Sequence, residues 1–469
     1  MEERKIYQRR SGAVFAIILI AVLFSTPLVA QVDADATVKT KALYGNLKRI
    51  QKSDQFLFGQ EFFNSFRYNS GNAHGNKGNS DSKDVTGSHP ALLGSDFHYY
   101  LEKDVSERSY HTEAVKWAYQ QGCVITFDWH IRGRNTNTYQ YNATSKDLAN
   151  NIVNNLNGDR EWFYGELDKI IDIINHDLVV DEDTIPIVFR PFHEMNGNWF
   201  WWGSAATNAT NYKALYALIV DYVKARTKSV LFCWSPNTPV DFNYYPGNNY
   251  IDIIGVDGYE VTTATLRTQL GLIVDYAQAN NKIAVFAETG YRSDQGTPAG
   301  DEARATYWKN TVLPGIMNDP AGKAKKIAWV LTWINSSWSV PYVPHASSSS
   351  AAKQSFIDFK NSTNVLFADE VDDMYTFTEI PVAIEEDNAS EDLRVYPVPA
   401  NDFVTVKIER FAKPSQISLY DSMGKLVYEI STRQNEEMIN VKEIASPGIY
   451  ILRVSDKKRS VNKKIRVDK

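Results

Sequence analysis

Short apolar runs recur along most of the chain, and each ends in polar or aromatic residues. Between most of them lie amphipathic stretches, such as the one in which Leu167, Ile170, Ile171 and Ile174 fall at helical spacing on one face. Wholly apolar strands that alternate with helices predict a parallel sheet covered on its outside. The eight predicted strands begin near Phe56, Pro90, Cys123, Ile185, Ser229, Tyr250, Lys282 and Ile327.

Eight such units predict an α/β fold, a (β/α)8 TIM barrel, which we place at residues 31–368. An open doubly wound sheet is the alternative. That fold usually carries a Gly-rich phosphate loop after its first strand, and FGQEFFNS, which starts at Phe58, is not such a loop. The barrel is therefore the favoured architecture.

The pattern changes after the eighth strand. Residues 369–392 are strongly acidic and lack a helical stripe, so we interpret them as a linker. Residues 393–469 contain runs such as FVTVKIE and GIYILRVSD, which alternate apolar and polar side chains and predict a small all-β, sandwich-like domain. A truncated chain that ends near Asn364 is accordingly expected to keep near-full activity.

Residues 1–30 carry basic side chains, then the apolar run AVFAIILIAVLF, then small residues that end at Ala30. This order is typical of a secretory signal peptide cleaved near Ala30, and it predicts an extracellular or outer-membrane surface location. An uncleaved membrane anchor is the alternative, although the run is shorter than the ~20 residues that a membrane span requires.

The composition of the chain limits the classes of partner that it can bind. The formal net charge of -6 over 469 residues is too mild to indicate nucleic acid or an acidic polymer. The chain holds 11 Trp, 26 Tyr and 22 Phe, whose flat faces suit sugar rings, although protein cores also use aromatics. We expect a neutral partner and a monomer.

Cys123 and Cys233 both lie in apolar runs, so we expect buried free thiols.

The segment RPFHEMNGNWFWWG at residues 190–203 concentrates the candidate chemistry. A zinc protease helix would read HExxH, but Gly197 stands at the second histidine position. The Asn-Gly pair favours a strand that opens into a loop, with Glu194 at the strand tip. The alternative is an aromatic patch under a loop, in which Glu194 pairs with Arg190.

In a TIM barrel the chemistry lies at the carboxyl ends of the strands. Glu194 ends the fourth strand and Glu288 ends the seventh. Two carboxylic acids at separate tips fit glycoside hydrolysis, in which one protonates the leaving oxygen while the other attacks the anomeric carbon. The remaining candidates at the tips are His130, His193, Trp199, Asp257, Tyr259 and Trp333.

Together with WSPN, VDGY, AETG and Trp333, this segment resembles glycoside hydrolase family 26, whose best known members are endo-β-1,4-mannanases. The resemblance covers residues 40–360. It implies a retaining enzyme that cleaves internal β-1,4-mannosidic bonds of mannan, glucomannan or galactomannan by double displacement. Glu194 would be the acid/base and Glu288 the nucleophile. No cofactor or metal is implied.

The resemblance also implies supporting roles. Tyr259 would orient the nucleophile, and Trp199 and Trp333 would stack on sugars. His130, His193 and Asp257 would make polar sugar contacts. One position departs from the pattern, because Ile334 stands where several family mannanases have Arg. A β-1,3-xylanase, a mixed-linkage β-glucanase and a non-catalytic glycan-binding barrel remain the alternatives.

The C-terminal segments VYPVPANDFVTV and PGIYILRV are similar to the sorting domains of the type IX secretion route. Val398 departs from the usual YPNPA opening. The resemblance implies the secretion machinery as a partner. A carbohydrate-binding β-sandwich is the alternative, and the few candidate exposed aromatics speak against it.

Overall fold

The computed structural model describes residues 31–68, 77–292, 298–376, 393–409, 411–420, 426–456 and 460–468. The chain forms two compact units, Met1–Phe377 and Thr378–Lys469. The predicted signal peptide and residues 377–392 of the predicted linker lie outside the described residues. Among the helices of the described ranges, none has the length and apolar character needed to cross a membrane.

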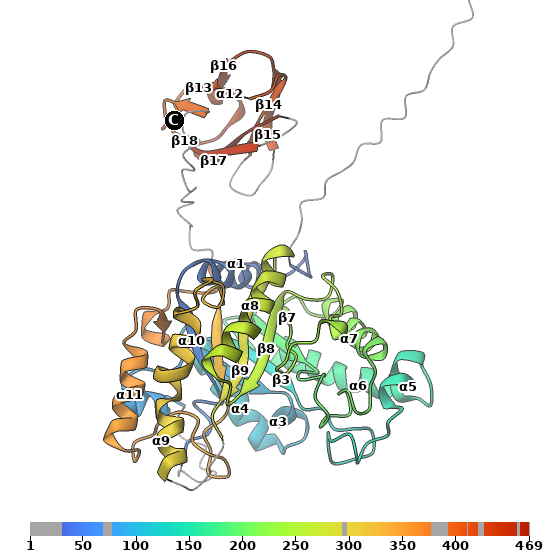
Figure 1. The fold of residues 1–469 in the computed structure, drawn as a ribbon. Helices are drawn as coiled ribbons and strands as arrows, with labels where there is room; N and C mark the ends of the chain where they lie inside the picture. Colours follow the sequence, from blue (N-terminus) through green and yellow to red (C-terminus); the bar gives the residue numbers. More distant parts are fainter. Residues whose placement is uncertain are drawn as a thin grey trace, which may run out of the picture. The chain divides into compact units, whose positions relative to one another are not determined.

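The first unit is a closed barrel of parallel strands surrounded by helices (Figure 1). Its strands are β1 (Phe56–Glu61), β2 (Leu92–Asp96), β3 (Val124–Trp129), β6 (Ile187–Pro191), β7 (Val230–Trp234), β8 (Ile253–Tyr259), β9 (Ile283–Gly290) and β10 (Trp329–Thr332). Pairing of β10 with β1 closes the barrel, and the short strand β11 (Val365–Leu366) adds to the other side of β1. The (β/α)8 prediction is confirmed and the open sheet is excluded.

Helices precede and connect the strands. They are α1 (Val38–Lys52), α2 (Asp81–Thr86), α3 (His98–Leu101), α4 (Val105–Gln120), α5 (Leu148–Asn154), α6 (Asp159–Asp172), α7 (Ala209–Lys224), α8 (Thr263–Ala279), α9 (Pro298–Tyr307), α10 (Leu313–Met317) and α11 (Ser350–Lys360). A small hairpin of β4 (Val179–Val180) and β5 (Asp183–Thr184) precedes β6. The predicted stripe of α6 and the turn after it is buried, as expected.

Alternate residues of each strand face the barrel interior and the helices. On β1, Leu57 belongs to the interior cluster, while Phe58 packs outward among aromatic rings that include Phe356 and Phe367. Leu43 and Leu47 of α1 join the interior cluster, so α1 helps to close the barrel core. Cys123 and Cys233 are buried free thiols, as predicted.

The predicted boundary of the linker is wrong at its start. Met374 is fully buried in the interior cluster, and Tyr375 packs beside it and donates a hydrogen bond from its hydroxyl to the Cys123 carbonyl (2.8 Å). The side-chain amide of Asn46 donates to the carbonyl oxygens of Met374 and Thr376. Residues up to Thr376 therefore belong to the barrel unit, because two apolar side chains within the acidic stretch dock on the core.

The second unit is all-β, as predicted. Its strands are β12 (Leu393–Tyr396), β13 (Phe403–Ile408), β14 (Ser415–Tyr420), β15 (Leu426–Thr432), β16 (Glu436–Asn440), β17 (Gly448–Ser455) and β18 (Ser460–Val467), with the helical turn α12 (Val441–Ile444). One sheet has the order β12-β13-β16 and the other β15-β14-β17-β18. Alternate residues, such as Val404 and Val406 of β13, are buried in the unit's own core.

Candidate active site

A cleft of about 500 Å³ lies at the carboxyl ends of the barrel strands. It brings together seven of the eight predicted site residues, and Asp257 is the one that does not line it. The cleft is lined by His130, His193, Glu194, Trp199, Phe200, Asn237, Thr238, Gly258, Tyr259, Val261, Glu288, Arg292, Trp333 and Tyr342.

The loop after β6 presents His193 and Glu194 in an uncommon backbone conformation. Phe192 and Glu194 both have a φ of 53°, in the left-handed region that residues with a Cβ atom disfavour. Neighbouring groups hold the loop: the Glu194 amide donates to the Ser235 carbonyl (2.9 Å), and the Trp202 indole donates to the His193 carbonyl (2.8 Å). The backbone that carries the two side chains is therefore fixed relative to the barrel.

The environment of Glu194 favours its protonated form up to near-neutral pH. Burial, followed by repulsion from Glu288, raises the pKa of Glu194 to about 7. The Trp199 indole donates a hydrogen bond to Glu194 Oε2 (2.8 Å), which acts in the opposite direction. Gly197 makes this contact possible, because a Cβ atom there would lie 2.4 Å from the Trp199 ring.

Glu288 lies in a different environment, at the end of β9. Arg190 Nη2 donates to its Oε2 (2.6 Å), and the Tyr259 hydroxyl donates to its Oε1. Both carboxylate oxygens therefore have a donor from the protein. The Tyr259 contact is the one that the family resemblance implies for the residue that orients the nucleophile.

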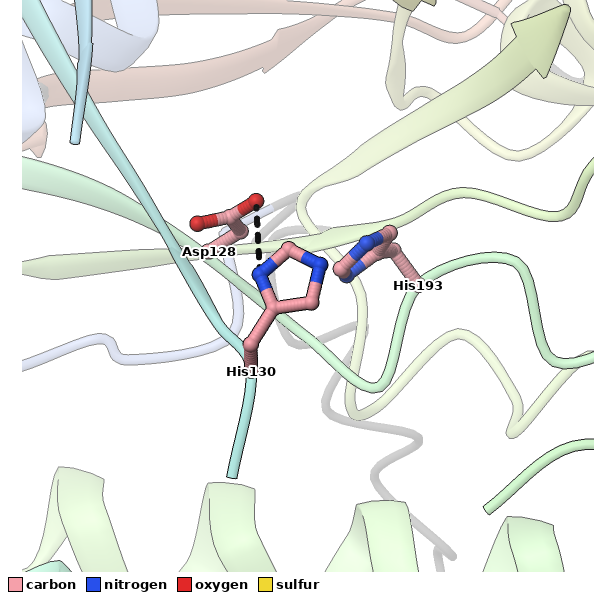
Figure 2. Close-up of side chains that lie close together, drawn as sticks. All are labelled: Asp128, His130 and His193. Carbon is pink, nitrogen blue, oxygen red and sulfur yellow. Dashed lines mark ion pairs between the residues drawn. The ribbon is translucent and has the colours of Figure 1, made fainter. Parts of the chain in front are cut away.

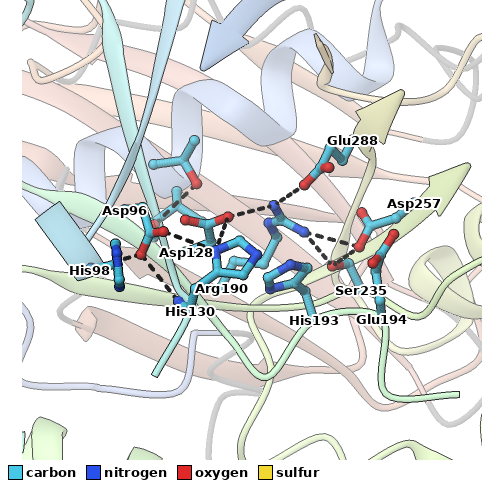
Figure 3. Close-up of polar contacts among 12 residues, drawn as sticks. Asp96, His98, Asp128, His130, Arg190, His193, Glu194, Ser235, Asp257 and Glu288 are labelled. Carbon is cyan, nitrogen blue, oxygen red and sulfur yellow. Dashed lines mark hydrogen bonds and ion pairs between the residues drawn. The ribbon is translucent and has the colours of Figure 1, made fainter. Parts of the chain in front are cut away.

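Arg190 is buried at the centre of a group of carboxylates (Figure 3). Besides Glu288 it contacts Asp257 Oδ2 at 3.0 Å and Asp128 Oδ2 at 3.4 Å. The alternative in which Arg190 pairs with Glu194 is therefore wrong. Arg190 instead forms ion pairs with Glu288, which lines the cleft, and with Asp257 and Asp128.

Asp257 does not fit its predicted role as a sugar contact. Its side chain is fully buried, and Oδ2 accepts hydrogen bonds from Arg190 Nη1 and from the Ser235 hydroxyl (2.9 Å). Because β8 is shifted in register against β9 between Val256 and Asp257, the aspartate lies opposite Glu288 below the cleft floor. It is placed to position Arg190.

The two histidines meet at one wall of the cleft (Figure 2). Their ring centroids are 4.7 Å apart and nearly perpendicular. Burial lowers the pKa of His130, but Asp96, which contacts His130 Nδ1 at 2.9 Å, outweighs it and raises that pKa overall. Burial and then Arg190 lower the pKa of His193 well below its usual range. The charged form of His130 and the neutral form of His193 are thus favoured.

Asp128, His130 and His193 offer donor atoms within 4.8 Å of one another, so they could ligate one metal ion. Asp128 is, however, already an ion-pair partner of Arg190, and His130 Nδ1 is engaged by Asp96. A cation there would share Asp128 with a guanidinium. We therefore keep the interpretation of both histidines as sugar contacts.

Several residues of the site were not singled out from the sequence. Asp96 is the last residue of β2 and Asp128 the last but one of β3, and their position near strand tips was the available signal. Glu61 is buried on β1, where Gly94 leaves room for its carboxyl group. Burial and then Asp128 raise the pKa of Glu61 well above its usual range. Asn237, which also lines the cleft, ends the WSPN motif but had no role assigned to it, and the cleft-lining residues Thr238, Arg292 and Tyr342 carry no comparable signal.

The family model described as glycosyl hydrolase family 26 matches residues 32–328. The chain belongs to glycosyl hydrolase family 26. The solved family 26 catalytic domain of an endo-beta-1,4-mannanase from Bacillus sp. JAMB-750 is 28% identical, with a TM-score of 0.64 over 74% of this chain and 96% of that one. The structure of GH26C from Muricauda sp. MAR_2010_75 is 26% identical, with a TM-score of 0.66 over 75% and 96%.

Curated relatives of this family 26 chain include a mannan endo-1,4-beta-mannosidase from Bifidobacterium adolescentis, 27% identical over 65% of the chain. Another is mannan endo-1,4-beta-mannosidase A from Piromyces sp, 30% identical over 44% of the chain. The chain covers 32% and 34% of these two relatives' own lengths, so the likeness concerns only part of each. Residues 394–468 match the secretion system C-terminal sorting domain, which confirms the resemblance noted for the β-rich unit.

Proposed function

We propose that the chain is a secreted, retaining endo-β-1,4-mannanase. The observation that carries the proposal is the pair Glu194 and Glu288, which line one cleft in unlike environments. Burial favours the protonated form of Glu194, whereas Glu288 accepts hydrogen bonds from Arg190 and Tyr259. Pairs of carboxyl groups with divergent environments are typical of acid and nucleophile in glycosidases.

In the first step, an oxygen of Glu288 attacks the anomeric carbon as the bond to the leaving oxygen breaks. Glu194 gives its proton to that oxygen, so the departing sugar leaves as an alcohol. Arg190 and Tyr259 hold the attacking carboxylate in place during the step. The product is a covalent glycosyl-enzyme on Glu288.

In the second step, water attacks the same carbon from the side that the leaving group vacated, and Glu194 takes the water proton. Glu288 departs, which returns both carboxyl groups to their starting states and retains the anomeric configuration. Trp199 and Trp333 stack on neighbouring sugar rings, while His130 and His193 contact sugar hydroxyls. The neutral cleft aromatics suit an uncharged polysaccharide.

A hydrolysis panel of mannan, glucomannan, galactomannan, β-1,3-xylan and lichenan tests the proposal. We expect cleavage of the mannans, with viscosity falling well before many reducing ends appear, as internal cuts require. Cleavage of β-1,3-xylan or lichenan in place of mannan would contradict the substrate. If the protein bound these polysaccharides but hydrolysed none of them, the non-catalytic barrel would be favoured. Glu194→Gln and Glu288→Gln are the matched inactive controls.

The sorting-domain match supports secretion, with the secretion machinery as partner of the β-rich unit. In a host that has this route, the full chain should reach the cell surface or medium. A chain that ends at Phe377 should stay inside the cell envelope while keeping its hydrolytic activity in extracts. Export of both forms to the same extent would contradict this role.

A further inference from the structure

One aromatic side chain near the cleft is exposed without an evident structural role. Trp338, in the loop after β10, is 55% exposed. Among the described residues of the barrel unit, it is the only exposed Trp, Tyr or Phe. Single exposed apolar side chains are common on protein surfaces, but Trp and Tyr rings are enriched at binding surfaces.

Trp338 is supported from below. Its ring packs against Phe66 with centroids 4.9 Å apart and an interplanar angle of 84°. Phe66 belongs to a small buried cluster with Phe62 and Ile334. Trp338 is therefore held in position, with part of its surface facing solvent.

The same cluster continues to the cleft. Trp333, which lines the cleft, packs against the cluster of Phe62, Phe66 and Ile334. An apolar path thus connects a cleft tryptophan to Trp338. Ile334 is part of this path, because its side chain is buried against the two phenylalanines and leaves no polar group at the position where several family mannanases have Arg.

We propose that Trp338 forms an additional sugar-binding site, outside the cleft that holds Glu194 and Glu288, for a distal pyranose ring of the same polysaccharide. The ligand class rests on the proposed function, and the position rests on the continuity of the apolar cluster with the cleft. The flat indole face covers the apolar face of a pyranose, and the ring loses little conformational freedom on binding. A substrate long enough to extend from the cleft over Trp333 reaches the second tryptophan.

The test compares substrates of different length with Trp338→Ala. The value of kcat/KM should fall about 3- to 10-fold on long oligosaccharides, the range expected for one aromatic contact, and stay unchanged on the shortest cleaved substrate. Trp338→Phe should recover most of the loss. Trp162→Ala, which removes a partly exposed tryptophan from α6, is the matched control and should show no dependence on length.

Affinity electrophoresis in soluble galactomannan gives a second readout, in which Trp338→Ala should be retarded less than wild type. Equal losses on short and long substrates, or no loss together with unchanged retardation, would overturn the proposal for Trp338. Failure of wild type to cleave any mannan would instead refute the proposed function. In that case the same length series is run on the polysaccharide that wild type does cleave. Equal losses on short and long substrates, or no loss together with unchanged retardation, would again overturn the proposal for Trp338.

Discussion

Trp199→Phe tests the electrostatic account of Glu194. The indole N–H of Trp199 donates to Glu194 Oε2 (2.8 Å), which stabilises the ionised carboxylate. Phe keeps an aromatic ring for sugar stacking and removes this donor. The ionised form of Glu194 should then be less stable, and the pKa of Glu194 should rise above its value of about 7.

The size of the change follows from the bond that is lost. A hydrogen bond to a charged group contributes ~1.5–3 kcal/mol net, and ~1.4 kcal/mol corresponds to one pH unit. Trp199 is partly exposed, so water replaces some of the lost hydrogen bonding. We therefore expect an upward shift near the lower end of this range, about one pH unit.

The assay is kcat/KM against pH through the neutral and alkaline range, which reports the groups of the free enzyme. Glu194 must be protonated to act as the acid, so wild-type activity should fall as pH rises through about 7. In Trp199→Phe that fall should move to higher pH. Trp333→Phe, which changes the other stacking tryptophan, should leave the pH of this fall in kcat/KM unchanged. If the alkaline fall in kcat/KM of Trp199→Phe occurred at the wild-type pH or at a lower pH, the reasoning would be refuted.

Three further predictions concern the groups around this carboxyl pair. Tyr259→Phe removes a donor to Glu288, so turnover should fall about 10- to 100-fold while KM changes little, as steady-state kinetics would show; wild-type turnover would contradict the role. Asp257→Asn weakens the hydrogen bond from Arg190, which keeps Glu288 and Asp128 as partners, and should lower the free energy of unfolding by ~1.5–3 kcal/mol, measured by chemical denaturation, whereas an unchanged midpoint would count against that pairing. A chain that ends at Phe377 should melt and turn over like the full chain. The expectation that a chain ending near Asn364 stays active is corrected by the structure: such a chain should fail to fold, because it loses the buried side chains of Met374 and Tyr375.

The strand pattern was enough to predict the barrel and to place Glu194 and Glu288 at separate strand tips. Both conclusions depend on local features, namely apolar runs and the residues that end them. The fold then brings all tips of a parallel barrel to one end, so a shared site follows from topology. This part of the site could be predicted without coordinates.

The partners of Arg190 could not be predicted in the same way. The sequence places Arg190 four residues before Glu194, which made that pair a natural alternative. Arg190 lies within β6, whereas Glu194 lies in the loop after it, and the guanidinium meets Glu288 and Asp257 from other strands. Such contacts depend on the direction of side chains inside the barrel, which strand alternation alone does not specify.

The end of the barrel unit was misplaced for a related reason. Met374 and Tyr375 are two apolar residues in an acidic stretch, too few to give a periodic pattern. Their burial depends on docking against the interior cluster and on the hydrogen bond from Tyr375 to the Cys123 carbonyl, residues far apart in the chain. Local composition therefore predicted a linker where the structure has the end of the barrel.

The most direct test of the central claim is the anomeric configuration of the product that azide forms with Glu194→Ala. An aryl β-mannoside with a good leaving group needs no acid, so this variant should still form the glycosyl-enzyme on Glu288. Azide should then enter from the side that Glu194 vacates, and proton magnetic resonance should show a β-glycosyl azide. Glu288→Ala is the matched control, since any azide product there should be α. An α-azide from Glu194→Ala, or a β-azide from Glu288→Ala, would contradict the assignment of Glu194 as acid/base and Glu288 as nucleophile.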